Sequence, residues 1–127
     1  MSLQKPLGSG VHSIQKVFTQ LIATGLTSAL KVTGMKNHTF QVKVAAINTN
    51  VIVEVQGSND GTIFFPLTMD NTATATFAIT SNRATITGNG NFHLRVQNTS
   101  LHSVRFNFVS ESGGSAATLD VTYYGQS

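Results

Sequence analysis

The sequence predicts an all-β domain, an antiparallel β-sandwich or jelly roll of about eight to ten short strands. From residue 29 onward, apolar and polar residues alternate with a period of two, as in half-buried strands. Turn-forming residues separate these alternating runs at short intervals. Charged residues make up only 10% of the chain, and Thr, Ser, Asn and Gly take their place. This composition suits strands and turns, and it excludes the charge-rich class of disordered proteins.

The length of 127 residues fits one domain, with an arm before it. Residues 1–10 contain Pro6, Gly8 and Gly10 without a periodic pattern, which predicts a flexible N-terminal arm. Residues 11–127 are predicted to form a single β-sandwich domain. Residues 11–24 fit either a helical apolar stripe or a strand with Val17 and Leu21 facing inward, and their β-branched content favours the strand.

Residues 40–44 and 53–57 are predicted to pair as a hairpin. The apolar residues occupy even positions in the first run and odd positions in the second. A two-residue turn at 48–49 places Val44 opposite Val53 on the inward face and Lys43 opposite Glu54 on the outward face. Opposite charges that face each other across strands are favourable, so this register satisfies both faces.

A second hairpin is predicted between residues 92–96 and 104–108. Inward residues of the two runs match in parity, and the register sets Arg95 directly opposite Arg105 on the outward face. Facing like charges destabilise a sheet. The pair is explained if an acidic group of a partner lies between the two side chains, or if both side chains splay into water.

The clearest turn is Ser58-Asn59-Asp60-Gly61, because Asp-Gly supplies the positive φ of tight turns. The strand that follows contains Pro66, which predicts an edge strand. A second turn is predicted at 81–82, and the last strand carries Leu119 and Tyr123 inward.

No catalytic or metal-binding constellation can be argued from the residues. Cysteine is absent, and the four histidines do not form an i, i+2 or i, i+4 pair. The acids do not form the paired carboxylates of a glycosidase, and no Gly-x-Ser-x-Gly elbow is present. We therefore expect no enzymatic activity and no cofactor, and a function in binding.

Candidate interface residues follow from charge and aromatic character. Lys5 lies in the predicted arm, and Arg95 and Arg105 form the predicted outward pair. Tyr123 and Tyr124 are adjacent, so one of them must point outward from a strand. The lysines are scattered singly and form no basic run, which argues against a nucleic-acid partner. No apolar segment is long enough to span a membrane, and the first residues do not resemble a signal peptide.

From Leu21 onward the sequence resembles small β-sandwich virion proteins of tailed bacteriophages. The segments that carry the resemblance are Ala23-Thr24-Gly25, Ala29-Leu30-Lys31-Val32, Thr39-Phe40-Gln41-Val42, Val53-Glu54-Val55-Gln56-Gly57-Ser58-Asn59-Asp60-Gly61-Thr62, Phe92-His93-Leu94-Arg95-Val96 and Ala117-Thr118-Leu119-Asp120-Val121-Thr122. The Trp that often follows the Asn-Asp-Gly turn in this family is absent here.

The resemblance implies a structural role, with no active-site residues to carry over. Such proteins are often capsid decoration (cement) proteins, frequently trimeric. We therefore expect a homotrimer that binds the major capsid protein on the capsid surface and stabilises the head, after assembly in the host cytoplasm. The alternative is a carbohydrate- or receptor-binding module of a phage head or tail fibre, which would need an exposed aromatic platform.

Overall fold

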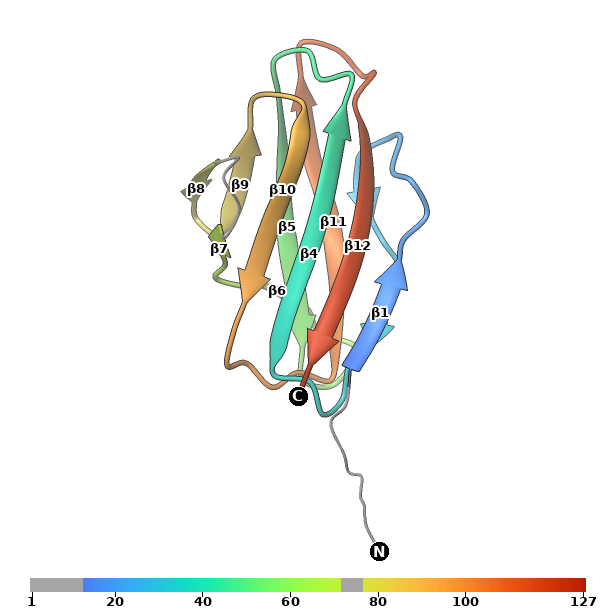
Figure 1. Cartoon of the computed structure of the whole chain (residues 1–127), viewed down its shortest axis with the longest axis vertical. Helices are drawn as coiled ribbons and strands as arrows, with labels where there is room; N and C mark the ends of the chain where they lie inside the picture. The colour runs from blue at the N-terminus through green and yellow to red at the C-terminus, as the bar shows by residue number, and fades with distance from the viewer. Residues whose placement is uncertain (1–12, 72–76) are drawn as a thin grey trace, which may run out of the picture.

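The computed structural model describes residues 13–71 and 77–127, which form two antiparallel sheets packed face to face (Figure 1). This confirms the predicted β-sandwich. The arm predicted over residues 1–10, with Lys5, lies outside the described residues, as do positions 73–76 of a predicted strand.

Five strands form the first sheet. In spatial order they are β1 (Ser13–Val17), β12 (Thr118–Gln126), β4 (Asn37–Ala45), β10 (Gly90–Val96) and β7 (Asp70–Asn71).

The second sheet has five strands in one path and two short additions. The path is β2 (Gly25–Leu26), β11 (Ser103–Ser112), β5 (Asn50–Ser58), β9 (Arg83–Ile86) and β8 (Ala78–Thr80), while β3 (Leu30–Lys31) pairs with β11 and β6 (Phe65–Pro66) pairs with β5.

The core lies between the two sheets and is built from the inward residues that alternation predicts. Phe40 of β4 and Phe106 of β11 belong to opposite sheets, and their ring centroids are 6.1 Å apart. Tyr123 of β12 lies 5.0 Å from Phe40, ring to ring. All three side chains are fully buried, so this aromatic group joins the two layers.

Both predicted hairpins are wrong in their pairing, although the strands themselves are confirmed. β4 pairs with β12 and β10, whereas β5 pairs with β11, β9 and β6 of the other sheet. Likewise β10 pairs with β4 and β7, whereas β11 lies in the second sheet. The chain therefore crosses between the sheets at residues 46–49 and 97–102. When two consecutive strands lie in opposite sheets, their inward residues face each other across the core. A match between the apolar positions of the two strands therefore does not show that they pair as a hairpin.

The structure corrects two predicted cross-strand pairs and one predicted inward position. Lys43 faces Asp120 and Asn91 instead of Glu54. Arg95 does not face Arg105, because the two arginines lie in different sheets. Val17, expected inward, is 66% exposed, while its neighbour Phe18 is buried.

The turn at Ser58–Gly61 is confirmed, and its side chains explain its shape. Ser58 Oγ accepts hydrogen bonds from the backbone N–H groups of Asp60 (3.2 Å) and Gly61 (2.9 Å). Asp60 Oδ1 accepts from the backbone N–H groups of Thr62 and Ile63, and Gly61 has a φ of 78°. Those backbone hydrogen bonds to the carboxylate lower the pKa of Asp60 to about 2. Pro66 follows in the short strand β6, which, within the part of the chain that the structure describes, pairs with β5 alone and so lies at an edge.

Candidate functional site

The outer face of the first sheet brings two of the predicted interface residues together. Arg95 of β10 and Tyr124 of β12 both lie opposite Thr39 of the strand between them. Tyr124 is 40% exposed, and Arg95 Nη2 lies 3.3 Å from Asp70 Oδ2 on the edge strand β7. The pairing places an exposed aromatic ring and an ion pair in one row across this face.

Tyr123 points into the core and is therefore not an outward contact residue. Its hydroxyl lies 2.5 Å from His38 Nδ1, and His38 Nε2 lies 2.9 Å from the carbonyl oxygen of Thr99. A carbonyl can only accept, so Nε2 carries the proton and Nδ1 accepts from the Tyr123 hydroxyl. A side chain at position 125 would collide with the Tyr123 hydroxyl, which explains the glycine there.

Burial sets the protonation states of this pair. His38 is fully buried, and desolvation lowers its pKa, although the hydrogen bond to Thr99 partly opposes that effect. Burial also raises the pKa of the Tyr123 hydroxyl. Both side chains are therefore neutral at physiological pH, and the pair is a satisfied polar element of the core.

We predict that stability falls as the pH drops below the ordinary histidine value of 6.5, because His38 resists protonation in the folded state. The unfolded chain binds a proton there, and the folded chain binds it only at the lower pKa, so stability is lost between these two values. Urea unfolding at about pH 7.5 and about pH 5.5 measures the difference. The variant His38→Gln should show a smaller difference, and an equal one would exclude His38 as its source.

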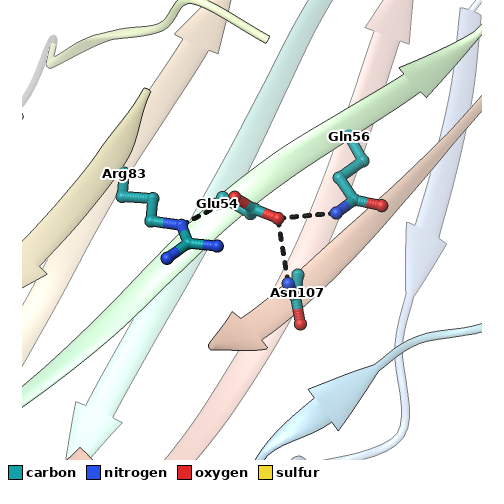
Figure 2. Close-up of polar contacts among 4 residues, drawn as sticks. All are labelled: Glu54, Gln56, Arg83 and Asn107. Atoms are coloured by element: carbon teal, nitrogen blue, oxygen red, sulfur yellow. Dashed lines mark hydrogen bonds and ion pairs between the residues drawn. The ribbon is translucent and has the colours of Figure 1, made fainter. Parts of the chain in front are cut away.

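The outer face of the second sheet carries a buried carboxylate that the sequence did not reveal. Glu54 of β5 is only 2% exposed although it points away from the core. Its Oε1 accepts from Arg83 Nε of β9 at 3.1 Å. Its Oε2 accepts from Gln56 Nε2 at 2.6 Å and from Asn107 Nδ2 of β11 at 2.9 Å. Figure 2 shows these donors converging on the carboxylate from three strands.

The carboxylate is ionised despite its burial. Desolvation by burial raises the pKa of Glu54, but the hydrogen bonds from Asn107, Gln56 and Arg83, together with the charge of Arg83, hold it below its ordinary value. A buried charge with this number of donors is compensated. The charged form of Glu54 is thus part of the folded structure.

Arg105 extends this network. Its Nε donates to Gln56 Oε1 at 2.7 Å, and its guanidinium carbon lies 4.0 Å from the centre of the Phe64 ring. A stacked guanidinium is held by the ring quadrupole as well as by its hydrogen bond. We call Glu54, Gln56, Arg83, Arg105 and Asn107 the Glu54 network.

Sequence reasoning missed this network because its members come from three strands, β5, β9 and β11, that are far apart in the chain. Arg83 is 29 residues from Glu54, and Asn107 is 53 residues from it. The available signal was that Glu54 occupies an outward position of an otherwise apolar strand. The predicted hairpin explained this position by pairing Glu54 with Lys43. Only the pairing of β5 with β9 and β11 brings the true partners together.

Other kinds of site are small or absent among the described residues. Within residues 13–71 and 77–127, no group of three or more His, Asp or Glu side chains is arranged to hold a metal ion. A hollow of about 160 Å³ opens beside β1, lined by Lys16, Phe18, Thr19, Leu21, Thr27 and Ser28. Small-molecule pockets are usually about 300–1,000 Å³, so this hollow is smaller than such sites. In the same two ranges, no helix has the length and apolar character needed to cross a membrane.

Comparison with known proteins adds a structural relationship. No protein-family model matches the chain, and no curated protein sequence matches it. The fold is similar to the crystal structure of the SPBc2 prophage-derived protein YomS, with a TM-score of 0.64 at 12% identity. The match covers 92% of this chain and 95% of that one. At this identity the likeness shows that the two chains share a fold.

Proposed function

We propose that this chain is a structural protein of a bacteriophage that acts by binding other virion proteins, and that it is not an enzyme. The observation that carries the proposal is the shared fold with a prophage-derived protein over 92% of this chain. The resemblance of its strand and turn segments to small phage virion proteins supports the same role.

Within that role, we propose capsid decoration: a homotrimer that binds the outer surface of the major capsid protein and stabilises the head. The two outer faces support a binding role, because among the described residues no further layer covers either sheet. One face carries Tyr124 with Arg95, and the other carries the Glu54 network. In a symmetric trimer, the weak contacts that each copy makes with the capsid would add up to stable attachment.

One observation favours the second candidate, a carbohydrate- or receptor-binding module of a head or tail fibre. Tyr124 is exposed in the same row as Gln15, Thr39 and Arg95, so an aromatic ring lies beside polar groups. An exposed ring of this kind can stack on a sugar or contact a receptor protein. A glycan array with wild-type protein and Tyr124→Ala separates this candidate from decoration.

Cryo-electron microscopy of virions from the phage that encodes the chain tests the proposal. We expect density for the chain at threefold positions of the capsid and a solution mass three times 13.5 kDa. Density confined to the tail would contradict decoration and retain a structural role. Absence of the chain from purified virions would contradict the structural role itself.

A further inference from the structure

The outer face of the second sheet carries more positive than negative charge around the Glu54 network. Arg83 and Arg105 lie on the strands that flank β5, and Lys31 pairs with Ser103, two residues from Arg105 on the same face. The acidic side chains near them are Asp60, whose Oδ1 accepts from Ser58 Oγ opposite Ser103, and Glu54, whose two oxygens are already occupied by three donors. The first sheet differs, because its outer face matches Lys43 and Arg95 with Asp120 and Asp70.

The two arginines are held in place before any partner binds. In each, the hydrogen bond to the network uses Nε: Arg83 to Glu54 and Arg105 to Gln56. Phe64 also stacks against the guanidinium of Arg105. Fixing Nε orients the planar group and leaves the edge formed by its two terminal nitrogens directed away from that contact. This edge can bind a carboxylate in bidentate geometry.

The spacing of the arginines fits an extended acidic segment. β9 and β11 are both neighbours of β5, so the two side chains start from strands about 10 Å apart. Carboxylates on one face of an extended peptide repeat about every 7 Å. Two such carboxylates are within reach of the two long arginine side chains.

We propose that this face is a docking surface for an acidic, extended segment of a protein partner, with Arg83 and Arg105 each binding a carboxylate. The proposal goes beyond the proposed function, because it names the chemistry of a partner and is tested on the purified chain alone. Charge complementarity identifies the partner. Three cations around a buried carboxylate are too few for a nucleic-acid backbone, since proteins that bind one commonly make about 6–10 phosphate contacts.

The test is binding of a fluorescently labelled Glu-Thr-Glu-Thr-Glu peptide, measured by anisotropy at low salt, with Gln-Thr-Gln-Thr-Gln as the matched peptide. We expect Arg83→Gln and Arg105→Gln each to weaken binding about fivefold, the upper range for one exposed ion pair. Lys43→Gln, which removes the same charge from the opposite face, should change binding less than about twofold because salt and distance screen it. Far-ultraviolet circular dichroism verifies that each variant is folded.

Three results would overturn the proposal. The first is equal weakening by Lys43→Gln, which would show general attraction to a cationic protein. The second is full recovery of binding in Arg83→Lys and Arg105→Lys, since lysine keeps the charge but lacks the planar fork. The third is tighter binding of a thymidine oligonucleotide than of the acidic peptide. A negative peptide-binding result would not contradict the virion role, and absence of the chain from virions would not contradict the docking surface.

Discussion

Replacing Phe40 by alanine is expected to lower the free energy of unfolding by about 3–5 kcal/mol. The side chain is fully buried and lies between Tyr123 of its own sheet and Phe106 of the facing sheet. Truncation therefore removes contacts in both layers and leaves a cavity where they meet. Since small domains are stable by about 5–15 kcal/mol, the variant would lose a substantial part of its stability. Denaturant unfolding followed by circular dichroism measures the change.

The matched control is Gln41→Ala, one residue further along the same strand. Gln41 is exposed on the outer face, opposite Thr122 and His93. Its replacement should change stability by less than about 0.5 kcal/mol. A similar loss of stability in both variants would contradict the inward position of Phe40 and the outward position of Gln41.

Phe40 illustrates what could be predicted from the sequence and what could not. Alternation identified the strands and their inward residues, because a period of two is a local property of the chain. It did not identify which strands pair. The partners of β4 in its sheet are β10 and β12, and β12 lies at the other end of the described chain. A strand that crosses to the facing sheet presents the same alternation as one that turns back in a hairpin.

The candidate site was predictable to a smaller extent. That one tyrosine of Tyr123-Tyr124 points outward followed from alternation, and the structure identifies it as Tyr124. Arg105 was chosen as an interface residue because it was predicted to face Arg95, but the structure places Arg95 in the other sheet. The neighbours of Arg105 are Gln56 and Phe64. Tertiary pairing determines these contacts, so no local pattern contains them.

Replacing Glu54 by glutamine is expected to lower the free energy of unfolding by about 2–3 kcal/mol, because the amide keeps the shape but not the charge that three donors require. Arg83 is half exposed and can rehydrate, which keeps the loss below that of a fully buried ion pair. The matched change Asp120→Asn alters an exposed carboxylate on the opposite face, where Gln20 donates to it, and should cost less than about 0.5 kcal/mol. Equal losses in urea unfolding would contradict a structural role for the Glu54 charge.

The same variant separates orientation from net charge at the proposed docking surface. Glu54→Gln removes a negative charge from a face that attracts acidic peptides, so charge alone predicts tighter binding of Glu-Thr-Glu-Thr-Glu. It also replaces one of the two carboxylate oxygens with an NH2 group that can only donate, so three donors compete for one oxygen, the hold on Arg83 Nε weakens, and loss of orientation predicts weaker binding. We expect the weaker binding. In the variant the Arg83 guanidinium loses side-chain entropy when the peptide binds, whereas in the wild type the Glu54 network has already ordered it. Tighter binding in folded Glu54→Gln protein would show that the carboxylate opposes the partner instead of positioning the arginine that binds it.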